Sequence, residues 1–442
     1  MKKRRICVAA AVICLLLSGC TSLSLNSPDI LTPPKAEGSQ AETQELIKKS
    51  AGKSFEMVYP ERGDYQSSVI FVNLDDDDDD EAIAMYTREK ETVDLLVADK
   101  KNNNYTLLTE GTIHAPKIDR VELADFGGKT KEIVISYPGS SATLQSLTFL
   151  SVNGEDQDDM INSCAAHVIG DFNGDKIDDL MTLSPGDGEN LPTARLYIGA
   201  DGTREEQSSC EVASNIKEYV NLSFGKICDE MSGAVVDAVD NNGTYSTQII
   251  CYDYNQRSVI NPLYVSDGFE KTKRTAAIRS ADIDRDGIIE IPLCEPTDFS
   301  SNEDEGSVCD RIDWSSYEYT QADFSDKQSA ILCEKLGFIL NLTPEHADIV
   351  TARYTGENTM SVYLWEYKRN AAERTTKLLT VKRYKKEGFD NDAVLEAVAA
   401  ENNNYIYTYI IETEDDYYRY TDDEVKDNIV LIEEPSDDAP LK

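Results

Sequence analysis

Residues 281–291 read ADIDRDGIIEI, in which three acidic residues alternate with other residues, a glycine follows, and a fourth acid stands three positions after the glycine. The four acids are Asp282, Asp284, Asp286 and Glu290, and apolar runs flank them. Carboxylates this close together repel one another, and a hard divalent cation with oxygen ligands relieves the repulsion. The pattern therefore predicts a calcium-binding loop between two strands.

The same pattern occurs twice upstream, in residues 69–86 and 168–183. The equivalent positions hold oxygen-bearing side chains: Asn73, Asp75, Asp77 and Glu81 in the first loop, and Asp171, Asn173, Asp175 and Asp179 in the second. A helical EF-hand would need a bidentate glutamate at loop position 12, where these three loops have Ala84, Thr182 and Leu293. Since the last acid stands at position 9 between strand-like runs, the loops are not EF-hands.

The N-terminus has the features of an export signal. Basic residues at positions 2–5 precede a 12-residue apolar core over residues 6–17. That core is shorter than the ~20 residues that a membrane-spanning helix needs. Ser18 and Gly19 then precede Cys20, and this segment resembles the lipobox of bacterial lipoproteins. We expect Cys20 to become the palmitate-carrying N-terminus of an extracellular protein anchored to the outer face of the cytoplasmic membrane. The alternative is an ordinary secretory signal followed by a chance cysteine.

The composition narrows the class of partner. The net charge is −39, which repels nucleic acid and anionic lipid, so we expect no nucleic-acid partner. Hydrophobic residues make up 40% of the chain, which is enough for a folded core and argues against a disordered acidic chain.

Seven cysteines follow Cys20, so at least one of them has no partner within the chain. Export permits disulfides, and Cys294 with Cys309, or Cys228 with Cys251, could join neighbouring strands. The alternative is that most of the seven are small buried apolar residues.

The acidic motifs belong to a longer repeat. Five strand–loop–strand units start near residues 73, 125, 171, 225 and 282, spaced by 46 to 57 residues. That spacing suits four short strands, as in one propeller blade. Units that each expose one face should stack on their neighbours. We therefore expect a mainly β fold, a β-propeller of about five four-stranded blades followed by a small α+β domain.

Composition suggests the boundaries. The expected segments are a signal peptide at 1–19, a flexible tether at 20–54, the propeller at 55–322, the α+β domain at 323–434 and an acidic tail at 435–442. The tether is rich in Ser and Pro, with one short helix at about 42–49. Helical spacing predicts a second helix over 391–401. Thr421 and Glu424 form a capping box that opens a third.

The three loops that keep all four ligand positions, at 73–81, 171–179 and 282–290, are called the clean loops. They resemble FG-GAP/VCBS repeats, the calcium-binding propeller units of integrin heads and many bacterial surface proteins. The resemblance covers residues 60–320 and implies one Ca2+ per clean loop. The implied ligands are the side chains named above together with the position-7 carbonyls of Asp79, Ile177 and Ile288. Asp78 and Lys176 depart from the family by standing where glycine is preferred, and the units at 125 and 225 are expected to bind no metal. Integrin heads have seven blades, against five units here. The C-terminal region is similar in pattern to PsbP-like modules.

No catalytic constellation is apparent in the sequence. His114, His167 and His346 stand far apart, and neither H-E-x-x-H nor G-x-S-x-G occurs. We therefore favour a non-catalytic, lipid-anchored binding or adhesion module of the bacterial cell envelope, whose partner is an envelope protein or glycan. The alternatives are an enzyme that acts on envelope polysaccharide with paired carboxylates, and a structural subunit of a membrane-surface complex.

Overall fold

The computed structural model describes residues 39–432, with internal gaps at 53, 102–103, 142, 153–159, 187–189, 265, 267, 298–307, 369–370 and 391–393. The predicted signal peptide, Cys20 and the acidic tail lie outside the described residues. Within the described part of the chain, no helix is long and apolar enough to cross a membrane.

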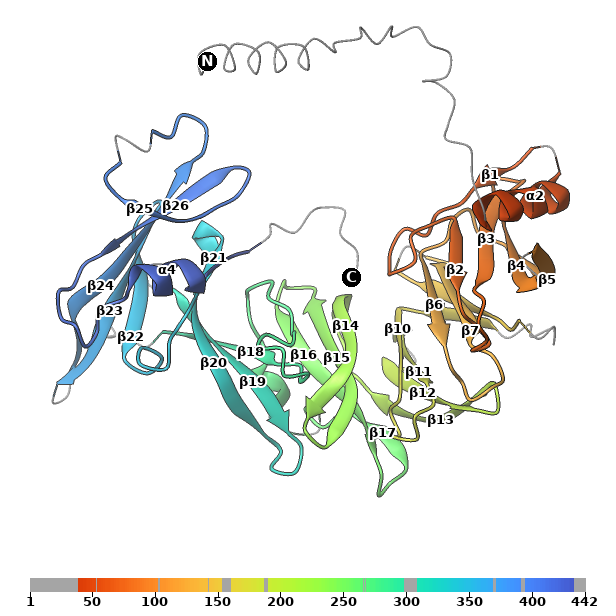
Figure 1. Cartoon of the computed structure of the whole chain (residues 1–442). Helices are drawn as coiled ribbons and strands as arrows, with labels where there is room; N and C mark the ends of the chain where they lie inside the picture. The colour runs from red at the N-terminus through yellow and green to blue at the C-terminus, as the bar shows by residue number, and fades with distance from the viewer. Residues whose placement is uncertain are drawn as a thin grey trace, which may run out of the picture.

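The described residues form six antiparallel sheets. Figure 1 shows them following one another in chain order along a curved row, with the first and the sixth at opposite ends. Contacts between sheets join neighbours in this row, for example β10 with β14 and β14 with β19. Antiparallel sheets of four strands that stack in chain order fit a propeller-like, mainly β fold.

The first four sheets each contain four strands in chain order. In the first sheet, β1 (Glu56–Met57) also pairs with β3, on the same side of β3 as β2. Their strands are, sheet by sheet, β2 (Val69–Val72), β3 (Glu81–Thr87), β4 (Val93–Lys101), β5 (Asn104–Ile113); β6 (Arg120–Ala124), β7 (Glu132–Pro138), β8 (Gln145–Leu150), β9 (Met160–Cys164); β10 (Ala166–Gly170), β11 (Asp179–Ser184), β12 (Thr193–Ala200), β13 (Thr203–Glu211); β14 (Ile216–Cys228), β15 (Met231–Asp240), β16 (Tyr245–Asp253), β17 (Ser258–Ile260).

The fifth and sixth sheets complete the row. The fifth is β18 (Ile291–Pro296), β19 (Asp310–Glu318), β20 (Asp323–Cys333), β21 (Phe338–Asn341) and β27 (Ile429–Leu431), and the sixth is β22 (Val350–Gly356), β23 (Thr359–Lys368), β24 (Ala371–Lys385), β26 (Tyr405–Ile411) and β25 (Ala397–Glu401). The five predicted units therefore fall in sheets one to five, one unit to each sheet.

Stacking of sheets explains why the inner strands are apolar on both faces. Side chains alternate along a strand, so Ile83 and Ala84 of β3 point to opposite sides of the first sheet. Ile83 joins a buried cluster with Ile133 of the second sheet. Ala84 joins a separate cluster with Ile47, which lies on helix α2 (Ser39–Ala51). Each face is thus covered, one by the next sheet and one by the helix.

Helix α2 corrects the predicted tether. The short helix expected at 42–49 extends over residues 39–51, and its Ile47 side chain is fully buried against the first sheet. The segment from 39 onward is therefore part of the folded module. The spacing of its few apolar residues among polar ones hid this docking in the sequence.

The boundary predicted at 323 is wrong, because it falls inside the β19–β20 hairpin. Ladder pairs run from Asp310 opposite Leu332 to Glu318 opposite Asp323. After the sixth sheet, the chain returns through α4 (Asp422–Asn428) to place β27 beside β21 in the fifth sheet. The capping box of α4 is present as predicted, with the Thr421 side chain accepting from the Glu424 amide.

The helix predicted over 391–401 is also wrong, since Ala397–Glu401 is strand β25 at the edge of the sixth sheet. Leu395, which would anchor a helical face, is 99% exposed. The backbone pairs with β26 instead, from Ala397 opposite Tyr409 to Glu401 opposite Ile406. Pairing with a neighbouring strand overrode the local helical propensity.

Neither predicted cysteine pair is a cross-strand pair. Cys294 lies opposite Ile312 rather than Cys309. Cys228 lies opposite Met231, and strand β15 separates it from the strand that carries Cys251.

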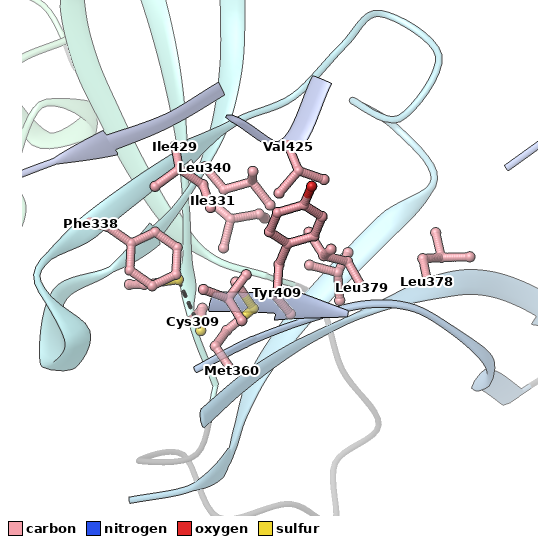
Figure 2. Close-up of a cluster of buried hydrophobic side chains, with 14 of the residues drawn as sticks. Cys309, Ile331, Phe338, Leu340, Met360, Leu378, Leu379, Tyr409, Val425 and Ile429 are labelled. Atoms are coloured by element: carbon pink, nitrogen blue, oxygen red, sulfur yellow. Dashed lines mark hydrogen bonds between the residues drawn. The ribbon is translucent and has the colours of Figure 1, made fainter. Parts of the chain in front are cut away.

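One hydrophobic cluster spans the fifth and sixth sheets. Figure 2 shows Phe338 and Leu340 of β21 gathered with Met360, Leu379 and Tyr409 of the sixth sheet. The Val425 side chain of α4 belongs to the same cluster. Two sheets that share one core should unfold together.

The two tryptophans of the chain test this shared core, because Trp314 lies on β19 and Trp365 on β23. Trp365→Phe leaves a reporter in the fifth sheet, and Trp314→Phe leaves one in the sixth. We expect the two fluorescence transitions in urea to coincide. Leu340→Ala removes a fully buried side chain and should lower both midpoints, at a cost of about 2–5 kcal/mol.

The matched control is Val430→Ala on β27, whose side chain is 47% exposed. It should change the unfolding free energy by no more than about 0.5 kcal/mol. Two separate transitions, with Leu340→Ala shifting only one, would show that the fifth and sixth sheets unfold independently.

Candidate metal loops and a polar pocket

The acid at loop position 9 occupies the same place in all three clean loops. It is the residue opposite the last residue before the loop: Val72 faces Glu81, Gly170 faces Asp179, and Ala281 faces Glu290. All three acids are buried. A charged carboxylate in that position requires compensating partners.

The backbone supplies one such partner in each loop. The amide at loop position 2 donates to the buried acid, with N···O distances of 2.6 Å for Leu74 to Glu81, 2.9 Å for Phe172 to Asp179 and 3.0 Å for Ile283 to Glu290. Each amide satisfies one carboxylate oxygen, so the loops differ in what happens to the other.

The second oxygen has no protein partner in two of the loops. Glu81 Oε1, Glu290 Oε1 and also Asn73 Oδ1 are buried without a hydrogen bond. Around these atoms, ligand oxygens of Asp75, Asp77 and Glu81 lie within 4.8 Å of one another, as do those of Asp282, Asp284 and Glu290. Clustered oxygens with an unsatisfied buried member are the donor set that Ca2+ prefers, so both loops fit the ion.

The electrostatics of the two glutamates agree with this geometry. Burial, followed by the charges of Asp75 and Asp77, raises the pKa of Glu81. Burial, followed by the charge of Asp284, likewise raises the pKa of Glu290. A cation placed among these oxygens would offset both causes and favour the ionised form.

Predicted ligands also hold the turns of these two loops through hydrogen bonds to backbone amides. Asp286 Oδ1 accepts from the amide of Ile288 at 2.8 Å, and Asp77 Oδ1 accepts from the amide of Asp79 at 2.7 Å. Ile288 also forms a parallel bridge with Lys226 of the fourth sheet. The Asp79 carboxylate pairs with Lys100 at 3.1 Å.

The loop at 171 satisfies its own carboxylates. Asp179 accepts from the amides of Phe172, Asn173 and Gly199, and Asp171 accepts from those of Gly174, Asp175 and Lys176. Burial raises the pKa of Asp179 to about 6. Aspartate is one methylene shorter than glutamate, and its second oxygen meets the Gly199 amide of β12 instead of projecting into the loop.

The predicted third site is therefore not assembled in the same way. The residues Asp171, Asn173, Asp175, Ile177 and Asp179 form a hydrogen-bonded turn, in which the Asn173 amide group donates to Asp175 at 2.9 Å and the Asp175 carboxylate accepts from Ile177. Lys176, at the position where glycine is preferred, has a φ of 71°, whereas the equivalent Gly287 has a φ of 90°.

In the unit at 125, the buried acid is paired with an arginine of the next sheet. Glu132 faces Ala124, which is the register position of Glu81 and Glu290. The guanidinium of Arg204, on β13, forms an ion pair with Glu132, and both side chains are buried. The guanidinium also lies 3.7 Å from the ring centre of Phe149. In this unit, where Asp125 is the only other acid of the loop, an arginine supplies the positive charge beside the buried glutamate.

Sequence reasoning missed Arg204 because it is 72 residues from Glu132. The available signal was Glu132 itself, an acid kept at the strand start in a loop whose only other acid is Asp125. A buried carboxylate that has lost its neighbouring ligands needs another positive partner, but the sequence does not say where that partner lies.

A pocket of about 1080 Å3 lies among residues of the first four sheets and their connections. Four basic residues line it, Arg62, Lys117, Arg120 and Lys217, together with three acidic residues, Glu61, Asp119 and Glu218. The lining is thus nearly neutral in charge, although the chain as a whole has a net charge of −39. Tyr137, Leu144, Leu191 and Tyr219 add apolar surface.

Ion pairs hold the pocket residues in place. Arg62 binds Asp119 through two bonds, with Nε···Oδ1 at 2.8 Å, and Lys117 binds Glu61 at 2.7 Å. His167 also lines the pocket, and its Nε2 lies 2.6 Å from Glu122 Oε2, so a histidine that is isolated in the sequence has a specific partner in the fold. Burial opposes the ionisation of Glu122, but His167 and Arg120 outweigh it and lower its pKa.

Comparison with known proteins finds similar solved structures. The fold is similar to a crystal structure of a protein from Lactobacillus plantarum, with a TM-score of 0.28 and 10% sequence identity, covering 73% of this chain and 94% of that chain. No protein-family model matches the sequence. No curated protein matches it.

The Arg204–Glu132 pair makes a direct prediction. Arg204→Met leaves a buried carboxylate without its cation and should destabilise the protein by about 3–5 kcal/mol in urea unfolding. Adding Glu132→Gln to Arg204→Met removes the unpaired charge and should recover part of that loss.

The control is Arg195→Met in the neighbouring strand β12, because Arg195 pairs with Glu206 where both side chains are 45% exposed. Solvent screens that pair, so we expect a change below about 1 kcal/mol. Equal losses for Arg195→Met and Arg204→Met would contradict the special role of the buried pair.

Proposed function

We propose that this protein is a non-catalytic binding module of the bacterial cell envelope, in which two calcium ions stabilise a propeller of the FG-GAP/VCBS type. The observation that carries the proposal is the pair of buried glutamate oxygens, on Glu81 and Glu290, that have no protein partner and lie among clustered acids. The proposed ligands are Asn73, Asp75, Asp77 and Glu81 in one loop, and Asp282, Asp284 and Glu290 in the other.

Calcium in these loops would act on stability and position rather than on chemistry. One loop joins β2 to β3, and the other precedes β18, so each ion would fix the entry to a buried strand. Ca2+ sites of extracellular modules commonly have Kd values of ~10⁻⁴–10⁻³ M, which suits a protein that works outside the cell.

In this proposal, Cys20 carries the lipid that anchors the protein to the outer face of the cytoplasmic membrane. Residues 21–38 separate Cys20 from the start of α2 at Ser39. At ~3.5 Å per residue, this segment of 18 residues spans at most about 60 Å. The module would therefore stay close to the membrane, and we expect its partner in the inner part of the envelope.

The polar pocket is the proposed ligand site. Its mixture of compensated charges and tyrosine and leucine surface suits a polar polymer with few charges, such as an envelope glycan, or a loop of an envelope protein. The acidic chain as a whole disfavours nucleic acid. The carboxylates Glu61 and Asp119 are held by Lys117 and Arg62, which favours binding over acid–base catalysis. An envelope polysaccharide-acting enzyme and a structural subunit are the alternatives.

Calcium dependence tests the metal part of this proposal. Binding to the folded state alone adds RT ln(1 + [Ca2+]/Kd), about 2.7 kcal/mol at a hundredfold excess over Kd. We expect 10 mM Ca2+ to raise the Tm and EDTA to lower it. Asp284→Asn and Asp75→Asn should each remove part of this shift.

Asp175→Asn, in the self-satisfied loop at 171, is the matched control and should keep the full calcium-dependent shift. A wild-type Tm that is the same in Ca2+ and in EDTA would show that the two loops hold no metal.

The pocket is tested with purified peptidoglycan sacculi as the probe. Wild-type protein should co-sediment with sacculi, and Lys217→Glu at the pocket should weaken this binding at least about tenfold, since it reverses a lining charge. Lys426→Glu, on α4 and outside the pocket lining, should bind as the wild type does. Release of soluble sugars by the wild type would favour the enzyme, and absence of co-sedimentation would exclude this glycan as the ligand.

A further inference from the structure

Two cysteines face each other at the open end of the β19–β20 hairpin. Asp310 pairs with Leu332, so Cys309 and Cys333 are the next residues in register. Their sulfur atoms are 4.0 Å apart, and both side chains are buried. Figure 2 marks this contact from the Cys309 sulfur, beside Phe338 and Met360.

We propose that Cys309 and Cys333 form an intrachain disulfide in the mature, exported protein. Residues directly opposite in an antiparallel pair have Cα atoms about 4.5–5.5 Å apart, which lies within the ~4.4–6.8 Å that disulfides span. The two sulfur atoms already lie 4.0 Å apart. Rotation of the side chains can therefore form the bond without moving the strands.

The other five cysteines lack such a partner across their ladders. The residues opposite them are Gln145 for Cys164, Ala194 for Cys210, Met231 for Cys228, Gly233 and Ile260 for Cys251, and Ile312 for Cys294. The pair at 309 and 333 is thus distinguished by register as well as by contact.

The chemistry rests on the proposed export, since an extracytoplasmic thiol–disulfide oxidoreductase must supply the oxidant. The thiolate of one cysteine attacks the oxidoreductase disulfide and forms a mixed disulfide. The thiolate of the second cysteine then displaces the oxidoreductase. Two thiols are oxidised to one disulfide, and their two protons and two electrons pass to the oxidoreductase, whose disulfide is reduced to two thiols.

Burial sets the order of events. Burial raises the pKa of the Cys333 thiol, and the core of the fifth and sixth sheets covers both sulfurs. A thiol is reactive as its thiolate and when accessible. Oxidation therefore precedes closure of this core during folding, and the finished bond is protected from reductants in the folded protein.

A bond between these residues would close a 25-residue loop that contains β19 and β20. Closing the loop lowers the conformational entropy of the unfolded chain and so stabilises the folded state. We expect the Tm to rise by about 5–10 °C as a result. The fifth sheet would gain a covalent link at the point where it meets the sixth.

The experiment counts free thiols by alkylation of full-length protein, unfolded without reductant. One sample is taken from membranes of cells that export the protein. The other is reduced, unfolded and refolded with oxidised glutathione. We expect five of the seven cysteines after Cys20 to react, and a non-reduced peptide that joins residues 309 and 333.

Single substitutions give opposite shifts in this count. Cys309→Ser frees its partner and should raise the count from five to six, whereas the control Cys294→Ser should lower it from five to four. Wild type and Cys294→Ser that are reduced with dithiothreitol while unfolded, and refolded in its presence, should melt about 5–10 °C below the oxidised proteins, whereas the same treatment should leave the Tm of the double variant Cys309→Ser/Cys333→Ser unchanged.

Seven reactive thiols in both samples, or a linked peptide that joins other cysteines, would overturn the pairing. Seven in the membrane sample but five after refolding would support the pairing and contradict the export on which the proposed function depends.

Discussion

A carboxylate buried where the chain enters a strand is the constraint on which the repeated part of this structure depends. Glu81, Glu132, Asp179 and Glu290 all hold that position, each opposite the residue that precedes its loop. A charge at such a place is stable only with partners that replace water. Each unit must therefore supply such partners, from its own loop or from elsewhere in the fold.

The four units meet this requirement in different ways. The loop at 171 uses backbone amides, and the unit at 125 uses the guanidinium of Arg204. The loops at 73 and 282 leave one glutamate oxygen without a protein partner among clustered acids, which is where we propose calcium. The difference between Asp179 and the two glutamates is one methylene, yet it decides whether the second oxygen reaches the Gly199 amide or the loop interior.

Stacking of sheets gives the rest of the architecture. Both faces of an inner strand are covered, so neighbouring sheets share clusters and the row has no natural break at residue 323. The chain crosses into the sixth sheet and returns as β27, which ties the two together. The polar pocket lies where connections of the first four sheets meet, and ion pairs rather than apolar packing hold its charged walls.

The sequence by itself determined the repeated strands, their four-strand units, the acidic loops and the capping box of α4, because periods of two and fixed loop spacings are local properties. It could not place α2, the β19–β20 hairpin or strand β25, since each depends on which surface is available for packing or pairing. Nor could it distinguish the self-satisfied loop at 171 from the loops at 73 and 282, or join Arg204 to Glu132 and Cys309 to Cys333. Those outcomes depend on contacts between residues far apart in the chain, and only the tertiary structure brings such residues within bonding distance.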